Sequence, residues 1–419
     1  MSRTIGKETV TGKKEIELST DVGDEAAIYP FPQPSALEPP EEWALLRQGC
    51  PAARVRMTSG DEAVLLTRYD DVRRMLSDQR FSRQLTAPDA ARVSDAEGVT
   101  FDETPTPATG PGHLRWRRLV SRAFSARRMA EIRPRIAAMA EHLIDEMLAA
   151  GAPADLIAAF GFPLPVWVIC ELLGFPNVDR DRFAHWSSAM LNVTHHSRAE
   201  IDTALAEFDD YLRKHIAAKR ADPADDLLSE LITVADARDG RLSEPELRST
   251  AQILLAAGHE TTANMIGKMV AMLLADRQRW ERLRADDSLV APAVEESLRF
   301  DANFGFGIPR YLSEPIDVAG ATLPSGTTVV CNVSAANRDG RAFDSNETMN
   351  LSRSPNPHLT FGVGQHSCLG QALARVELQV ALEALLHRLP NLDLAVSPEA
   401  LVRREGLIVG GLATLPVRW

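Results

Sequence analysis

The sequence predicts a mainly α-helical protein with small β-sheets. Apolar residues recur at helical spacing through most of the chain after Pro111, and the longest such run extends from Ser243 to about Ala275. At 1.5 Å per residue this helix would be about 50 Å long. The strand-like stretches that follow it are short, at Ile316–Val318, Thr327–Val333 and Leu407–Val417.

The chain of 419 residues is long enough to bury a large core. We find no Ser/Gly linker, low-complexity block or internal repeat that would divide it. We therefore expect residues 28–419 to form a single domain. The polar residues 1–27 are expected to form a flexible N-terminal extension.

Composition and charge favour a soluble protein. Hydrophobic residues make up 45% of the chain and charged residues 25%, both ordinary for a globular domain. The net charge of −12 argues against generic nucleic-acid binding. The N-terminus carries neither a signal peptide nor a membrane anchor. The scattered cysteines predict reduced residues in a cytoplasmic protein rather than a disulfide framework; they are Cys50, Cys170, Cys331 and Cys368.

The first part of the chain alternates short helices with strands. A helix is expected near Glu41–Gln48, after a proline-rich segment. Two alternating apolar runs within Ala53–Thr67, split by a Ser-Gly-Asp turn, predict a β-hairpin. Asp70 begins another helix. The long segment Phe81–Gly112 is rich in Pro, Thr and Asp, and loops of this length in a compact domain are usually functional or mobile.

Helices dominate after Pro111. The longest one begins with Ser243 and Glu246 at the spacing of a capping box. It is not expected to cross a membrane, because His259, Glu260 and Lys268 interrupt its apolar run. Other amphipathic stretches predict helices at Met129–Leu148, Pro165–Leu173, Asp179–Met190 and Ile201–Arg220.

The most informative segment is Phe361–Gly370, which reads FGVGQHSCLG. Cys368 ends a glycine-punctuated loop directly before an apolar helical run, where a helix N-terminus stabilises a thiolate. Such a thiolate suits a soft or borderline metal, and haem iron is one of these. Two alternatives are a buried structural cysteine and a zinc site made with His358 and His366, although no CxxC or HxxxH pair accompanies them.

The middle of the longest helix reads AAGHETT, from Ala256 to Thr262. Gly258 costs about 1 kcal/mol relative to alanine inside a helix. Glu260 and Thr261 are polar in an otherwise apolar helix, which predicts a local opening where a hydroxyl group replaces helical hydrogen bonds. The alternative is a buried acid that joins neighbouring helices.

These segments, together with an E-x-x-R motif at Glu296 and Arg299, resemble the cytochrome P450 family. The string F-G-x-G-x-H-x-C-x-G of its haem-ligand loop is matched at all six positions, and AAGHETT is similar to its oxygen-activation segment. The resemblance covers residues 30–419 and indicates a soluble bacterial, actinomycete-like member. It implies a triangular helical fold with haem between the long central helix and the helix after the cysteine loop.

The resemblance also implies roles for individual residues. Cys368 would be the axial ligand of haem b (iron protoporphyrin IX), and Glu260 and Thr261 the acid–alcohol pair that delivers protons. Glu296, Arg299 and Arg353 would form a structural triad. The other residues expected to bind haem are His113, Arg117, Arg310, His366, Phe361, Gly362 and Gly370. The residues expected to line the substrate pocket are Ala256, Ala257, Asn303, Phe304, Phe306, Ile408 and Val409; the two phenylalanines could equally be packing residues.

One segment departs from the family pattern. Where the family has F-x-D-P-D-x-F-D, residues 343–350 read FDSNETMN, so that a proline and an aromatic residue are missing. This difference puts the rigidity of the segment in doubt, without affecting the haem assignment.

The resemblance implies a monooxygenase that activates dioxygen with electrons from a ferredoxin and an NAD(P)H-dependent ferredoxin reductase. We expect it to hydroxylate or epoxidise a lipophilic secondary metabolite, such as a polyketide or terpenoid in antibiotic biosynthesis, and to act as a monomer. The alternatives are a non-enzymatic haem sensor and a peroxide-driven haem enzyme of the same fold. A basic cluster is expected to dock the acidic electron donor and consists of Arg115, Arg117, Arg118, Arg122, Arg127 and Arg128.

Overall fold

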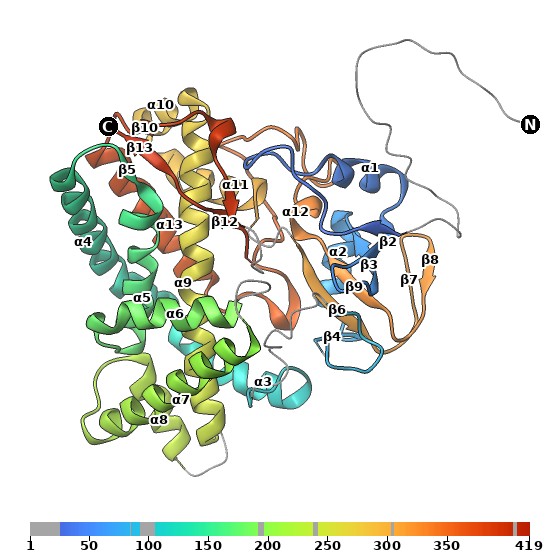
Figure 1. Cartoon of the computed structure of the whole chain (residues 1–419), viewed down its shortest axis with the longest axis horizontal. Helices are drawn as coiled ribbons and strands as arrows, with labels where there is room; N and C mark the ends of the chain where they lie inside the picture. The colour runs from blue at the N-terminus through green and yellow to red at the C-terminus, as the bar shows by residue number, and fades with distance from the viewer. Residues whose placement is uncertain are drawn as a thin grey trace, which may run out of the picture.

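The computed structural model describes residues 26–83, 85–92, 105–191, 197–237, 242–302, 306–404 and 409–419. Most helices occupy one side of the molecule, and the largest sheet lies on the other together with a few short helices (Figure 1). This arrangement confirms the mainly α-helical class with small β-sheets. Residues 1–25 of the expected N-terminal extension lie outside the described residues, and Ala27 already belongs to the first strand.

The helices follow the predicted order along the chain. In the described residues they are α1 (Glu41–Gly49), α2 (Tyr69–Ser77), α3 (Gly110–Val120), α4 (Ala126–Ala150), α5 (Pro163–Leu173), α6 (Arg180–Leu191), α7 (Arg198–Ala221), α8 (Leu227–Asp236), α9 (Glu244–Leu274), α10 (Arg277–Ala285), α11 (Val290–Phe300), α12 (Val333–Ala336) and α13 (Gln371–Arg388).

The strands form one larger sheet and three small ones. The larger sheet has the order β1-β2-β3-β9-β6-β4 and consists of β1 (Ala27–Ile28), β2 (Ala52–Arg56), β3 (Glu62–Leu66), β9 (Thr328–Cys331), β6 (Ile308–Leu312) and β4 (Phe81–Ser82). The small sheets pair β10 (Asp393–Leu394), β13 (Pro416–Arg418) and β5 (Ala154–Asp155); β11 (Arg403–Arg404) and β12 (Gly411–Leu412); and β7 (Ile316–Val318) and β8 (Ala321–Leu323).

The predicted hairpin is formed by β2 and β3, which pair antiparallel with Ala53 opposite Leu65. Gly60 makes the turn at a φ of +83°, a conformation that glycine adopts without a steric penalty. The hairpin joins the rest of the sheet through β3, which runs parallel to β9. Thr327–Val333 was predicted as one strand, but its end differs, because Val333 begins α12.

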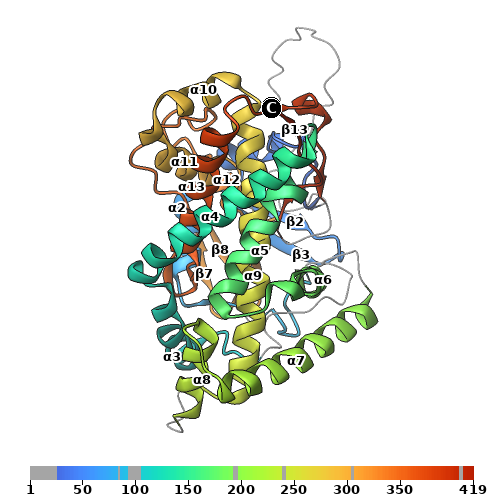
Figure 2. The same cartoon turned by 90° about the vertical axis from the view of Figure 1, so that its left-hand side faces the viewer.

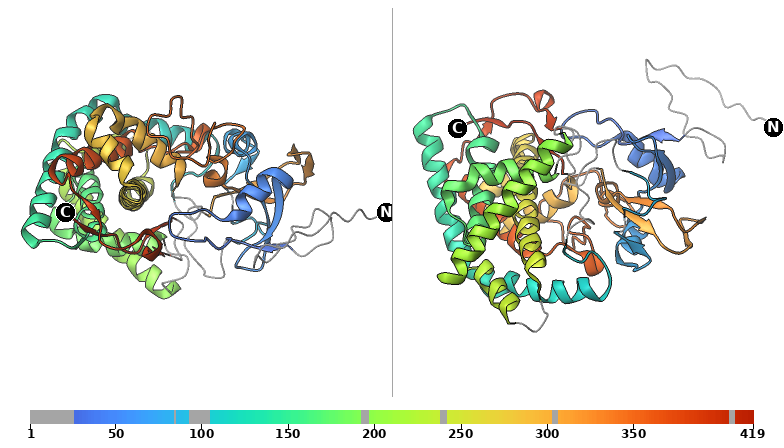
Figure 3. Two further views of the ribbon diagram at one scale, coloured as in Figure 1. Left: turned by 90° about the horizontal axis from the view of Figure 1, so that it is seen from above. Right: turned by 60° about the horizontal axis from the view of Figure 1, so that its bottom comes forward.

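The long helix α9 runs through the interior of the helical part, as Figure 2 and the view along its axis in Figure 3 show. Its capping box is present, with the Ser243 hydroxyl and the Glu246 carboxylate each accepting a backbone N–H. The helix packs against α5, α6 and α13. Consequently its middle is surrounded by protein, and a polar residue there needs a specific reason. In the described residues, no helix is both long and apolar enough to span a membrane.

Candidate functional site

The segment Phe361–Gly370 forms a tight loop that brings Cys368 to the start of α13. The Cys368 N–H donates to the Phe361 carbonyl over 2.7 Å, which closes the loop. Gly364 has a φ of +76°, and a Cβ there would lie 3.0 Å from the carbonyl oxygen of Leu76. Glycine is therefore required at this position for both conformation and space.

The remaining loop residues shape the surroundings of the sulfur. Gly362 has a φ of +63°, and Gly370 immediately precedes the first helical residue of α13. Phe361 and Leu369 are partly buried and pack against the main hydrophobic core. The loop is thus fixed on its core side, and its cysteine side chain is left exposed.

The Cys368 side chain is exposed, yet the protein around the sulfur raises the pKa of the thiol by burial. The Gly370 N–H and the positive charges of Arg117 and Arg375 act in the opposite direction and favour the thiolate. A metal cation in place of the proton would offset the cost of burying the thiolate. Two other cysteines, Cys170 and Cys331, are buried, and burial raises the pKa of each to about 12, as for inert core residues.

The zinc alternative is not supported by the neighbours of the two histidines. His358 Nε2 lies 3.0 Å from a carboxylate oxygen of Glu295, so this side chain is already engaged. In the part of the chain that the structure describes, no group of three or more His, Cys, Asp or Glu residues is arranged to hold a metal ion.

Two histidines beside the loop have buried ring nitrogens without protein partners. Among the described residues, Nδ1 of His113 and both ring nitrogens of His366 lack a hydrogen-bond partner. Their ring centroids are 4.3 Å apart. Burial, together with nearby positive charges, lowers the pKa of both rings, that of His366 to about 3. Buried polar atoms are almost always hydrogen-bonded, so these rings point to an acceptor supplied by a ligand.

Two arginines complete this cluster. Arg117 extends from α3, four residues after His113, and donates to the carbonyl and the hydroxyl group of Ser367, the latter over 3.0 Å. Arg310 in β6 donates to the Pro309 carbonyl over 2.9 Å and adds positive charge near His366. A pair of carboxylates would satisfy the histidines and balance the arginines. The two propionates of haem, beside the exposed thiol, fit this donor set.

The face of α9 that carries Ala257 and Thr261 is open, although the helix lies in the interior. Ala257 is exposed and Thr261 half-buried, whereas Ala256 is buried. Residues four apart lie on one helix face, so Ala257 and Thr261 share a face of α9 that other elements leave partly uncovered. At Gly258 the neighbouring helix approaches closely, and a Cβ there would lie 2.8 Å from the end of the Ile169 side chain of α5, which would have to shift.

The predicted opening of the helix at this point is wrong. α9 is helical without interruption from Glu244 to Leu274. The Thr261 hydroxyl donates to the Ala257 carbonyl over 2.9 Å, which adds a hydrogen bond to the helix. A side-chain hydroxyl group can share a helical carbonyl with the backbone N–H, so the helix need not open.

The acid of this segment is buried and has one ionic contact across the structure. Glu260 Oε1 lies 3.6 Å from Nη1 of Arg404 in β11. Burial raises the pKa of Glu260, and the arginine partly offsets this effect. The neighbouring His259 is buried, and burial lowers its pKa to about 4. The segment therefore contains an acid with a raised pKa beside a histidine that is neutral at neutral pH.

The E-x-x-R motif forms a buried ion-pair network. Glu296 accepts two hydrogen bonds of 2.8 Å from Arg299, and both side chains are fully buried. Arg353 donates to the same carboxylate over 3.0 Å, so the three residues meet as the resemblance implied. Arg299 also donates to the Asn337 carbonyl over 2.7 Å. Because every charge in this network has a partner, it is suited to holding chain segments together.

Only some of the expected pocket residues can be placed. Phe306 packs against Tyr29, with ring centroids 5.3 Å apart, which agrees with the expectation that it could be a packing residue. Val409 is buried, and Ala256 and Ala257 lie on α9 as described above. Three further expected pocket residues lie outside the described residues, namely Asn303, Phe304 and Ile408.

The basic cluster is largely occupied by partners within the protein. Arg115 pairs with Glu246, Arg127 with Glu131 and Arg128 with Glu230, while Arg117 binds the cysteine loop. Arg118 and Arg122 are exposed. Any docking face in this region therefore depends mainly on these two arginines and on the exposed Leu114.

Sequence reasoning missed three charged residues around the site. Arg375 pairs with Glu295, and Arg404 lies near Glu260. The sequence could have indicated the pair of Arg375 and Glu295, because Arg375 lies two helical turns after Cys368.

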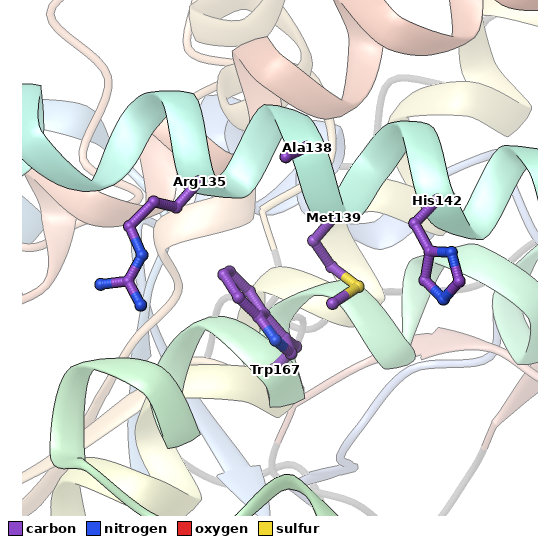
Figure 4. Close-up of a pocket in the computed structure, with 5 residues that line it drawn as sticks. All are labelled: Arg135, Ala138, Met139, His142 and Trp167. Carbon is purple, nitrogen blue, oxygen red and sulfur yellow. The ribbon is translucent and has the colours of Figure 1, made fainter.

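An open hollow between α4 and α5 contains none of the expected site residues (Figure 4). It is lined by Arg135, Ala138, Met139, His142 and Trp167.

Comparison with known proteins agrees with this geometry. The family model described as Cytochrome P450 matches residues 166–399. Nocardicin C N-oxygenase of Nocardia uniformis subsp. tsuyamanensis is 42% identical over 396 residues, which cover 93% of this chain and 98% of that relative. Mycinamicin IV hydroxylase/epoxidase of Micromonospora griseorubida is 41% identical, with 94% of this chain and 99% of that relative covered.

Solved structures show the same fold. The putative thioether synthase SgvP, involved in the tailoring step of griseoviridin, matches with a TM-score of 0.89 and 40% identity. The match covers 94% of this chain and all of that one. The mixed-function P450 MycG, in complex with mycinamicin IV, matches over the same share of each chain with a TM-score of 0.85 and 40% identity.

Proposed function

The chain belongs to the cytochrome P450 family, and from this premise we propose that it oxidises a lipophilic secondary metabolite. As a member of this family it is an oxidoreductase, a monooxygenase that uses dioxygen and a haem-thiolate centre. For this chain we propose haem b as the cofactor, and a ferredoxin with its NAD(P)H-dependent reductase as the electron source. The names of its relatives, an N-oxygenase and a hydroxylase/epoxidase, support a natural product as substrate.

Cys368 and the four basic side chains around its loop would hold the cofactor. The Cys368 sulfur would ligate the iron, and His113, Arg117, Arg310 and His366 would bind the propionates. Haem, when bound, supplies the iron at which dioxygen is reduced and the substrate is oxidised. Arg117 has a second task, since it also holds the backbone of the cysteine loop through Ser367.

Glu260 and Thr261 would deliver protons to the open face of α9. Burial raises the pKa of Glu260 above that of an exposed carboxyl group, which favours its holding a proton that it can pass on. The Thr261 hydroxyl already donates to the Ala257 carbonyl. This hydrogen bond orients the hydroxyl oxygen of Thr261 so that it can accept a hydrogen bond from a proton donor. Neutral His259 does not compete for protons. The small apolar side chain of Ala257 leaves room for substrate on this face.

One observation carries the cofactor assignment: the exposed Cys368 lies two residues after His366, whose ring nitrogens, like Nδ1 of the adjacent His113, are buried without a hydrogen-bond partner in the described residues. The test is the spectrum of the reduced, carbon monoxide-bound holoprotein. We expect the Soret band typical of thiolate ligation, and its loss in Cys368→His with haem still bound. Cys50→Ser, at a half-buried cysteine, serves as the control and should leave the band unchanged. An unchanged band in Cys368→His would refute the assignment.

The reaction is tested separately by turnover with ferredoxin, reductase and NADPH. We expect oxygenated product from a compound that shifts the haem spin state on binding. In Thr261→Ala, product per NADPH should fall while hydrogen peroxide release rises, because proton delivery is impaired. Absence of product from all spin-shifting compounds would favour a sensor, and full activity with peroxide alone would favour a peroxide-driven enzyme.

We also propose that the protein is a monomer and that residues 28–419 form one domain. Light scattering of the holoprotein would test the first point, and limited proteolysis the second. The described cysteines are unpaired, which favours the reducing cytoplasm as the place of action.

A further inference from the structure

A charged pair joins α11 to α13 beside the cysteine loop. Arg375 donates from Nε and Nη2 to the two carboxylate oxygens of Glu295, over 2.8 and 3.1 Å. His358 Nε2 lies 3.0 Å from the same carboxylate. Burial alone would raise the pKa of Glu295, but His358 and Arg375 outweigh this effect and lower it to about 2. Glu295 is therefore a fixed negative charge that clamps the arginine.

The clamped guanidinium lies over the aromatic ring of the loop. Arg375 Cζ is 4.4 Å from the centroid of the Phe361 ring, within the range of a cation–π contact. The backbone of Phe361 is bonded in turn to Cys368, whose N–H donates to its carbonyl over 2.7 Å. Glu295, Arg375, Phe361 and Cys368 thus form a continuous chain of contacts that ends at the proposed iron ligand.

The charges of the two arginines near the sulfur are balanced differently. Both Arg117 and Arg375 lie beside the cysteine loop: Arg117 donates to Ser367, the residue before Cys368, and Arg375 lies over the ring of Phe361, whose carbonyl accepts the Cys368 N–H. Arg117 binds neutral acceptors on Ser367, so its charge remains uncompensated by the protein. The charge of Arg375 is opposed by that of Glu295. Consequently the field at the sulfur depends on whether both members of this pair are present.

We propose that Arg375 is a positioning residue of the haem-thiolate centre, which fixes the Phe361 ring and, balanced by Glu295, sets how readily the iron accepts an electron. This inference rests on the proposed role of Cys368 as iron ligand. Reduction adds negative charge at the centre, so a nearby positive charge favours the reduced state and a negative charge disfavours it. Loss of Arg375 therefore disfavours reduction, and loss of Glu295 favours it.

The experiment measures the reduction potential of the holoprotein in Arg375→Gln and Glu295→Gln. We expect the equilibrium constant for one-electron reduction to fall at least about threefold in Arg375→Gln and to rise by a similar factor in Glu295→Gln, where tenfold would be about 59 mV. Arg388→Gln is the matched control, because Arg388 lies in the same helix and pairs with Glu141 and Asp145. Its potential should equal that of the wild type.

Opposite shifts distinguish this role from a structural one. Either substitution breaks the same ion pair, so mere loosening of the loop would move both potentials in the same direction. Potentials that shift in the same direction in both variants, or no shift in either variant, would overturn the proposal. If Arg375→Gln does not retain haem, Glu295→Gln must still raise the potential and Arg375→Lys, which keeps the charge, must not lower it; any other result overturns the proposal.

The carbon monoxide spectrum of each variant separates this inference from the proposed function. If the wild-type protein lacks the thiolate signature, the assignment of Cys368 fails and the inference fails with it. If the signature is present and the potentials do not shift in opposite directions, the haem-thiolate assignment stands and only the role of Arg375 is lost.

Discussion

Acidification should destabilise the folded protein through a buried histidine of α9. His259 is 1% exposed, and its Nδ1–H donates to the Leu255 carbonyl over 2.8 Å. Nε2 has no partner among the described residues and faces apolar surroundings that include the edge of Phe162. Protonation would place an unpaired charge in the interior. Burial therefore lowers the pKa of His259 to about 4, although the hydrogen bond to Leu255 acts against this shift.

The magnitude follows from the difference between the folded and unfolded pKa values. Between pH 6.5 and about 4, the unfolded chain binds one proton more at His259 than the folded chain, so the free energy of unfolding falls as the pH falls. Over the whole window the loss is about 3 kcal/mol, at 1.36 kcal/mol for each pH unit. Between pH 7 and pH 5 it is about 2 kcal/mol.

The assay is urea unfolding of the holoprotein at pH 7 and pH 5, in the wild type and in His259→Phe. Phenylalanine matches the ring shape and cannot be protonated, so the variant should lose about 2 kcal/mol less than the wild type on acidification. Other acid-sensitive groups, including His113 and His366, cancel in this comparison. The control is His142→Gln, at an exposed histidine of α4. If wild type and His259→Phe lost equal stability, the argument from burial would be wrong.

The remaining predictions concern the buried ion pair, the partner-docking face and the proton relay. Glu296→Gln should lower the free energy of unfolding by about 3–5 kcal/mol in urea titrations, because it leaves a buried arginine charge without its partner; a loss below about 1 kcal/mol would contradict this. Replacing Arg118 and Arg122 by Glu should slow reduction by ferredoxin and flatten its salt dependence in stopped-flow measurements; unchanged rates would exclude this face. Arg404→Gln should leave the spin-shift Kd of a bound compound unchanged but increase the solvent isotope effect on turnover, because Glu260 loses its ionic contact; equal isotope effects would count against that contact.

The long helix could be predicted to its ends because its signals are local. Ser243 and Glu246 lie close in sequence and cap each other, and the helix ends one residue before Ala275. The loop before Cys368 could also be predicted from the sequence. Its glycines are required by backbone conformation and by the close approach of α2, and both constraints leave a trace in the sequence.

Long-range partners could not be predicted in this way. Glu295 stands next to Glu296 in the sequence, yet their carboxylates bind different elements. The Glu295 carboxylate binds Arg375 of α13, whereas the Glu296 carboxylate binds Arg353 within the buried triad. Nothing in the spacing of the two residues separates these roles. Similarly, the arginines of this region suggested one basic face, whereas Arg115 and Arg128 are bound to carboxylates from other helices. Ion pairs between distant elements depend on the packing of whole helices, which a single sequence does not specify.

The segment 343–350 shows how a fold keeps a rigid region without the expected residues. It lacks the family's proline, but Glu347 accepts hydrogen bonds from Arg47 over 3.1 Å and from Arg338 over 2.8 Å, and both arginines are buried. Arg299 of the buried network donates to the Asn346 carbonyl over 3.0 Å. Proline would restrict the unfolded chain, whereas these contacts stabilise the folded one. The rigidity of this segment therefore depends on the same buried charges that meet at Glu296, so that loss of one carboxylate should loosen the segment and the approach to the cysteine loop together.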